Sequence, residues 1–177
     1  DLQTRSSEKD LIAFQKSVRK ISADYDLTLI DCPPSSSLLG WGPLFAADVV
    51  LIPASPAQFS SNGIRKMVDH IETVQGLHNP ELSILGIVVN LFDPRRNLHV
   101  AEMVNMTDTW GDLVFQNMLG NRNVYEEAIR HRKCVSEMNR EKKAKTEFLG
   151  FMEEFIHRAQ AKGFLKGVIR HAQKRAS

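Results

Sequence analysis

Three short apolar runs, each closed by a polar residue or a proline, constrain the fold of this 177-residue chain more than any other feature. The runs are Tyr25–Ile30, Val49–Ile52 and Ile84–Val89, and helical apolar patterns separate them. Continuously apolar strands that alternate with helices are typical of a parallel sheet, because such strands are buried on both faces. The sequence therefore predicts an α/β fold, a doubly wound and mostly parallel sheet with helices on both faces.

The helices are predicted from apolar residues that recur at helical spacing. A fourth short strand is expected at Leu113–Leu119. We expect one domain over residues 1–160, followed by a basic amphipathic C-terminal helix over residues 161–177. The helical patterns cover Leu11–Ile21, Ile64–Val74, Leu98–Met106, Val124–Arg132, Thr146–Ala159 and Phe164–Ala172.

Charge is distributed unevenly along the chain. Residues 1–120 hold 9 Lys+Arg and 14 Asp+Glu, whereas residues 121–177 hold 14 Lys+Arg and 7 Asp+Glu. A basic C-terminal third suits nucleic acid or anionic lipid, although a solvated helix face explains the charge equally well. The two cysteines are far apart and form no CxxC pair, which favours a cytoplasmic location.

Two polar residues stand at predicted strand ends, where ligands bind in open α/β sheets. Asp31 ends the first run and precedes Cys-Pro-Pro, and Asn90 ends the third run. A carboxylate at a strand end suits Mg²⁺ together with nucleotide phosphates, while an aspartate that caps the next turn is the plain alternative. An amide can donate and accept hydrogen bonds, as recognition of a base edge requires.

The stretch YDLTLIDCPPSSSLLGWGPLFAADVVLIPASP resembles the Walker B region of the ParA and Soj partition ATPases. These proteins belong to the deviant-Walker P-loop group, which includes MinD. The resemblance continues in an Asp-x-Arg-x-Asn-Leu motif that begins at Asp93, and in the pair Glu127-Ala128. The match is spread over most of residues 10–157, and it implies a P-loop NTPase-like fold.

The resemblance implies a role for four residues toward ATP and Mg²⁺. Asp31 would be the Walker B carboxylate that organises Mg²⁺, through a water molecule. Pro33 and Pro34 would lie in the switch that senses the γ-phosphate. Asn90 would read adenine, with a turn or cap residue as the alternative.

The resemblance also implies contacts with DNA. Arg95 matches an arginine that contacts DNA in the family, and Arg96 beside it would reinforce the contact. Four basic residues of the C-terminal third are further candidates, for which a solvated helix face is an equal explanation: Lys142, Lys143, Lys145 and Arg158.

The chain departs from the family pattern in three places. Leu119–Arg122 stands where Ile-Pro-Arg-Asn is frequent, which puts the adenine contacts there in question. Arg132 and Cys134 replace a common Gly and Pro. No KGGxGKT-like Walker A loop occurs anywhere in the chain, so we expect this chain alone not to hydrolyse ATP. We expect the natural protein to be longer, with a degenerate, naturally short and non-enzymatic relative as the alternative.

The resemblance implies a function in plasmid or chromosome partition. An ATP-dependent homodimer would bind DNA nonspecifically at the nucleoid, and a ParB-like partner would stimulate hydrolysis. The alternative is a MinD-like ATPase that positions cargo or acts at a membrane. That alternative depends on the tail KGFLKGVIRHAQKRA, which is basic on one side and apolar on the other and suits a membrane surface.

Overall fold

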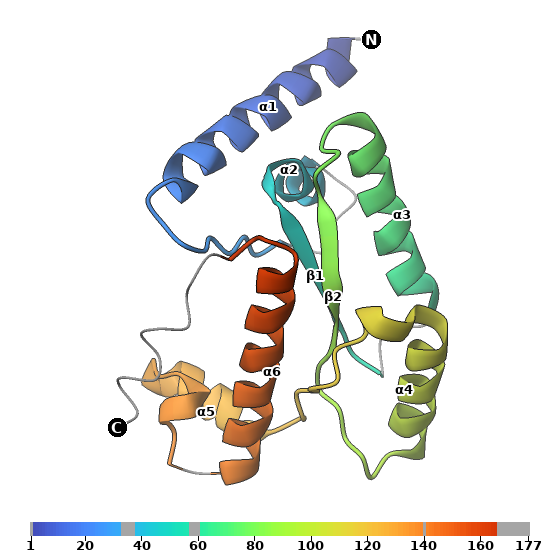
Figure 1. Ribbon diagram of the computed structural model, residues 1–177, viewed down its shortest axis with the longest axis vertical. Coiled ribbons are helices and arrows are strands. Elements are labelled where there is room, and N and C mark those ends of the chain that lie inside the picture. Colours follow the sequence, from blue (N-terminus) through green and yellow to red (C-terminus); the bar gives the residue numbers. More distant parts are fainter. Residues whose placement is uncertain (1, 33–37, 57–60, 140, 166–177) are drawn as a thin grey trace. The chain divides into compact units, whose positions relative to one another are not determined.

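The computed structural model describes residues 2–32, 38–56, 61–139 and 141–165 (Figure 1). The chain divides into two compact units. The first comprises Asp1–Val50, Val68–Ser83 and Ala159–Ser177, and the second comprises Leu51–Met67 and Ile84–Arg158.

The first unit is built around the packing of α1 (Leu2–Ser22) on α2 (Leu38–Ala46). The amide of Gln15 donates to the Phe45 carbonyl at 2.6 Å. Asn79, which is only 6% exposed, donates its side-chain amide to the carbonyls of Leu44 and Ala47 at 3.0 and 2.8 Å. These amides satisfy carbonyls at the C-terminal end of α2 that have no helical partner.

The second unit contains most of a two-stranded parallel sheet formed by β1 (Val49–Ala54) and β2 (Ser83–Val89). The crossover between the strands is α3 (Ser61–Leu77). At the far end of the pair, the Asn90 N–H donates to the Ala54 carbonyl at 2.8 Å. Ile87 and Val89 are fully buried. The predictions of these two strands and of the helix between them are confirmed.

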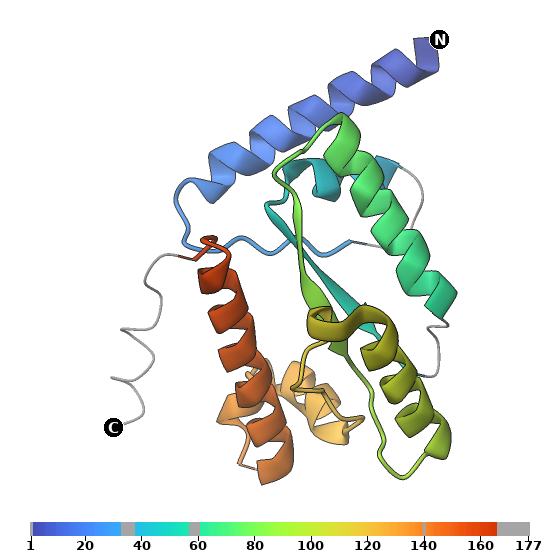
Figure 2. The same cartoon turned by 45° about the vertical axis from the view of Figure 1, so that its right-hand side comes forward.

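The remaining helices of the second unit follow the predicted order, with wider bounds for two of them (Figure 2). A small core of Val124, Ala128, Val135 and Ala144 joins the last two helices. The predicted pattern at Phe164–Ala172 is not helical at Phe164 and Leu165, and lies outside the described residues from Lys166 onward. The elements are α4 (Asn97–Trp110), η1 (Gly111–Leu113), α5 (Asn123–His131), η2 (Val135–Glu137) and α6 (Lys142–Ala161).

The strand predicted at Leu113–Leu119 is wrong as a regular strand. This segment follows β2 in parallel, with an isolated bridge between Ile87 and Val114, and the Leu119 N–H donates to the Val89 carbonyl at 2.9 Å. On its other side, the N–H groups of Gln116 and Asn117 donate to the carboxylate of Glu154 in α6. The segment is irregular because side chains of a helix, rather than a further strand, satisfy its outer backbone groups.

The strand predicted at Tyr25–Ile30 is also wrong, since these residues have no regular structure. Leu29 is 78% exposed and Tyr25 is 67% exposed. A strand forms only where a neighbouring chain segment accepts and donates its hydrogen bonds. Within the described ranges no strand pairs with this segment, so its apolar composition alone does not order it as a strand.

Candidate functional site

Asp31 follows the extended segment Tyr25–Ile30 and is exposed. Cys32 beside it is a free and exposed thiol. Partial desolvation, and then the charge of Asp31, raise the pKa of the Cys32 thiol, which disfavours the reactive thiolate at neutral pH. Pro33 and Pro34 lie outside the described residues. The roles predicted for Asp31 and the two prolines remain predictions.

Asn90 directly follows β2 and is half-buried. Its side-chain Oδ1 accepts a hydrogen bond from the Leu91 N–H at 2.9 Å. Leu91 adopts a φ of 59°, an uncommon value for a leucine. The Asn90 side chain thus stabilises a tight turn at the strand end, as expected if Asn90 is a turn residue. Because Oδ1 is engaged in this turn, Nδ2 is the side-chain atom that could bind a ligand.

The structure brings the Asn90 turn together with the segment Leu119–Arg122. The Phe92 N–H donates to the Leu119 carbonyl at 3.1 Å, and the Asn121 N–H donates to the Phe92 carbonyl at 3.0 Å. A parallel bridge joins Phe92 and Gly120. The two segments that the resemblance assigns to adenine are therefore neighbours at one end of the sheet.

An ion pair with α6 fixes the Leu119–Arg122 segment. The Arg122 guanidinium donates to both oxygens of Glu147 at 2.6 and 2.8 Å, and Glu147 also accepts from the Gly120 N–H at 3.3 Å. Desolvation alone would raise the pKa of Glu147, but the hydrogen bonds and charge of Arg122 lower it overall. A Cβ at Gly120 would meet Glu147 Oε2 at 2.9 Å, so glycine at this position allows the close approach.

The Asp93–Arg96 turn precedes α4. The Asp93 carboxylate accepts two hydrogen bonds from the exposed Arg95 guanidinium, both at 2.9 Å. The side-chain hydrogen bond from Arg95 lowers the pKa of Asp93 to about 2. His99, which is 3% exposed, accepts from the Asp93 N–H through Nδ1 at 3.1 Å, and its Nε2 lies 3.5 Å from the Arg96 guanidinium. The Asp93 carboxylate therefore holds the Arg95 side chain in place while that side chain stays exposed to solvent.

Lys142, Lys143 and Lys145 lie in the first turn of α6 and are exposed, whereas Arg158 is engaged within the protein. The Arg158 guanidinium donates to the carbonyls of Asp112 and Val114 at 2.8 and 2.9 Å and pairs with Glu154 at 2.8 Å. It also lies 4.3 Å from the centre of the Phe115 ring. These contacts account for Arg158 structurally, while its predicted role in DNA binding is untested.

Sequence reasoning missed the structural role of four residues of α6 that hold the segment after η1. The set comprises Glu147, Gly150, Glu154 and Arg158, of which Arg158 was considered only as a DNA contact or as part of a solvated helix face. Their spacing of three, four and four residues places them on one face of a helix, and this spacing was the signal that could have revealed them. A Cβ at Gly150 would clash with the Asn117 side chain, whose amide donates to Glu154 at 2.8 Å.

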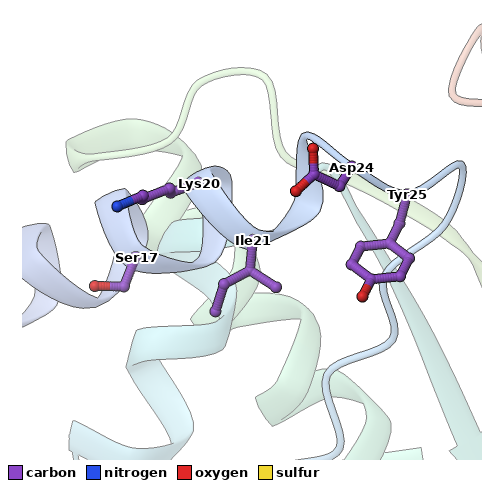
Figure 3. Close-up of a pocket in the computed structure, with 5 residues that line it drawn as sticks. All are labelled: Ser17, Lys20, Ile21, Asp24 and Tyr25. Carbon is purple, nitrogen blue, oxygen red and sulfur yellow. The ribbon is translucent and has the colours of Figure 1, made fainter.

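A hollow of 420 Å³ lies beside the C-terminal end of α1 (Figure 3). All of its lining comes from one helix end and the turn after it, namely from Ser17, Lys20, Ile21, Asp24 and Tyr25. None of the predicted site residues lines it. Within the parts of the chain that the structure describes, no group of three His, Cys, Asp or Glu residues could hold a metal ion. No helix in those same ranges is long and apolar enough to cross a membrane.

Comparison with known sequences gives a family match and named relatives. A family model described as an AAA domain matches residues 1–84. The chain is 39% identical over 85 residues to the chromosome partitioning protein ParA of Myxococcus xanthus, which is 48% of this chain and 30% of that protein. It is 32% identical over 118 residues to the chromosome-partitioning ATPase Soj of Treponema pallidum, 67% of this chain and 47% of Soj. The match thus spans less than half the length of either relative.

Solved structures share the fold of this chain. A Mycobacterium smegmatis cobyrinic acid a,c-diamide synthase with bound ATP analog and magnesium is 28% identical, with a TM-score of 0.56 over 63% of this chain and 46% of that chain. A Cyanothece McdA variant in complex with ATP is 19% identical, with a TM-score of 0.72 over 94% of this chain and 62% of that chain. The predicted fold class, α/β and P-loop NTPase-like, is confirmed. In sequence, the chain is similar to ParA and Soj proteins, as its motifs predict.

Proposed function

We propose that this chain is part of a ParA-like ATPase that segregates DNA. The observations that carry the proposal are the sequence similarity to ParA and Soj proteins and the family match over residues 1–84, which include Asp31. The turn geometry adds support, because Asn90 and the Leu119–Arg122 segment are hydrogen-bonded neighbours through Phe92. We assign the Nδ2 group of Asn90 to the adenine edge.

Hydrolysis needs groups that this sequence does not contain. Asp31 would organise Mg²⁺ through a water molecule, and Mg²⁺ would neutralise the charge that develops on the phosphates. The chain contains no KGGxGKT-like loop to cradle those phosphates. We therefore propose that ATP binding and hydrolysis belong to a longer protein of which this chain is a part, and we expect this chain alone to be inactive.

In that protein, an ATP-dependent homodimer would bind DNA nonspecifically in the cytoplasm, at the nucleoid. Arg95 supports this proposal most directly, since it is held exposed by the Asp93 carboxylate. Arg96 and the three lysines of the first turn of α6 would add phosphate contacts, which make binding steeply dependent on salt. A ParB-like partner would stimulate hydrolysis and so release the DNA.

The first experiment is to read the source DNA upstream of the codon for Asp1. An in-frame KGGxGKT-like sequence would support the proposal, and the complete protein would then be assayed for ATP hydrolysis with and without DNA. A translation start near Asp1 would overturn the ATPase function and leave the non-enzymatic relative. On the complete protein, Arg95→Gln should weaken duplex binding about tenfold without changing nucleotide affinity.

The MinD-like alternative depends on the basic and apolar pattern of residues 162–177. Deletion of these residues separates the two functions. If the truncated protein loses binding to anionic vesicles and keeps binding to DNA, the tail acts at a membrane surface. If vesicle binding is absent in the unchanged protein, the membrane alternative is wrong.

A further inference from the structure

Two runs of exposed basic residues flank the connection between α5 and α6. We call them together the basic corner. All of its side chains are exposed. Figures 1 and 2 show α5 beside the first turns of α6, and the shared core that contains Ala128 and Ala144 holds the two helices together. The two helices that bear the basic corner are thus packed against each other. It consists of Arg130, His131, Arg132, Lys133, Lys142, Lys143 and Lys145.

Arg132 occupies a backbone conformation that favours glycine. It caps the C-terminus of α5 in the left-handed region, with φ 53° and ψ 42°. The Lys133 N–H donates to the Ala128 carbonyl at 3.0 Å, which closes the helix end. Glycine adopts this conformation without steric cost, and helices commonly end on it. An exposed arginine thus stands where the backbone favours a residue without a side chain. Strain of this kind at an exposed position points to function.

The helix dipole explains only part of the basic corner. Cations near a helix C-terminus are stabilising, which accounts for Arg130 and His131 in the last turn of α5. Lys142, Lys143 and Lys145 occupy the N-terminal turn of α6, where the dipole disfavours positive charge, although Glu141 precedes the helix and the charge of Glu147 interacts with Lys143. The dipole therefore does not explain the three lysines, and the left-handed backbone does not favour an arginine at position 132.

We propose that the basic corner binds the phosphate backbone of duplex nucleic acid, with Arg132 as its central contact. This inference rests on the proposed function and adds the end of α5 to the DNA-binding surface. A membrane surface fits the corner less well, because an interfacial helix needs a continuous apolar face. On α5 the only large apolar side chain in the exposed class is Ile129, at 79%. Phosphate binding needs no such face, and it places no demand on base sequence.

The test compares Arg132→Gly with Glu141→Gly in the complete protein with ATP, the form to which the proposed function assigns DNA binding. Glu141 has a φ of 54°, so both substitutions relieve the same kind of backbone strain, but only the first removes a positive charge. Binding to a fluorescent duplex of random sequence is measured by anisotropy between about 50 and about 200 mM salt. Thermal melting is measured for each variant.

We expect Arg132→Gly to melt at or above the temperature of the unchanged protein. Its affinity for the duplex should fall about three- to tenfold, and the slope of log K against log salt should become shallower by about 1. The melting temperature of Glu141→Gly should change in the same direction. This variant should bind the duplex no more weakly than the unchanged protein.

Three outcomes overturn the proposal, and they differ in what they leave standing. If Arg132→Gly binds the duplex as well as the unchanged protein while Arg95→Gln binds weakly, the basic corner is not a contact but the proposed function remains. If the unchanged protein shows no salt-dependent duplex binding, both are wrong. If Arg132→Gly loses binding to phosphatidylserine vesicles and keeps duplex binding, the corner acts at a membrane.

Discussion

The segment Tyr25–Asp31 and the strand β2 with Asn90 have similar sequence patterns but different structures. Each is a short, mostly apolar run closed by a polar residue, although Tyr25–Ile30 also contains Asp26 and Thr28. In β2, Ile87 and Val89 are fully buried, and hydrogen bonds run to β1 on one side and to the segment after η1 on the other. In Tyr25–Asp31, Leu29 is 78% exposed. Apolar composition marks a segment that can become a strand, and paired neighbours decide whether it does.

Displacement of the segment after η1, which packs on β2, should give the largest loss of stability. A Cβ at Gly86 would lie 2.5 Å from the Phe115 ring and 2.7 Å from the Leu113 carbonyl oxygen. Gly86→Ala should therefore push the segment after η1 away from β2 and destabilise the fold by about 3 kcal/mol. Chemical denaturation measures this change.

Gly76→Ala is the matched control, because nothing lies within 4 Å of the Cβ that it would add. Gly76 lies in α3, where alanine should stabilise the protein by about 0.5–1 kcal/mol. Equal effects of the two substitutions would show that β2 does not depend on close approach of Phe115.

Much of the fold was predictable from local pattern, since apolar runs and apolar periodicity identified β1, β2 and every described α-helix except α2. The segment after η1 was not, because its course depends on Glu154 and Arg158, which lie about 40 residues further along the chain. For the site, the apolar run placed Asn90 at a strand end, and motif resemblance singled out Arg95, which the structure places on an exposed turn. It could not reveal that Glu147 holds Arg122, since no residue of α6 belongs to the quoted motifs.

Loss of the Glu154 carboxylate should give the next largest loss of stability, because this carboxylate accepts backbone hydrogen bonds that a neighbouring strand would otherwise accept. It accepts from two backbone N–H groups and the Asn117 amide, and it pairs with Arg158. Glu154→Gln should cost about 2 kcal/mol, since a partly buried guanidinium loses its charged partner. Glu153→Gln, at the exposed neighbouring position, should change stability by less than about 0.5 kcal/mol. Equal losses of stability in the two variants would show that Glu154 does not have this structural role.

Acid should weaken the same contacts. Desolvation acts to raise the pKa of Glu154 and of Glu147, but hydrogen bonds from Asn117 and Arg122 outweigh it and lower both. A carboxyl with a lowered pKa in the folded state stabilises the fold above its ordinary pKa of about 4.3. This contribution is lost as the pH falls from that value through the lowered pKa. Urea midpoints measured from neutral pH to about pH 3 should decrease in this window, and less so in Glu154→Gln. A parallel decrease in both proteins would contradict the assignment.

The smallest effect should come from the unpaired segment itself, and it tests the comparison directly. Leu29→Thr replaces an exposed side chain and should change the free energy of unfolding by less than about 0.5 kcal/mol. Val88→Thr, at a site in β2 that is only 3% exposed, buries a hydroxyl and should cost about 2 kcal/mol. If Leu29→Thr costs as much as Val88→Thr in this chain, Tyr25–Asp31 is a buried strand in solution. In a longer protein that supplies a neighbouring strand, we expect the cost of Leu29→Thr to rise toward that of Val88→Thr, because pairing would bury the segment.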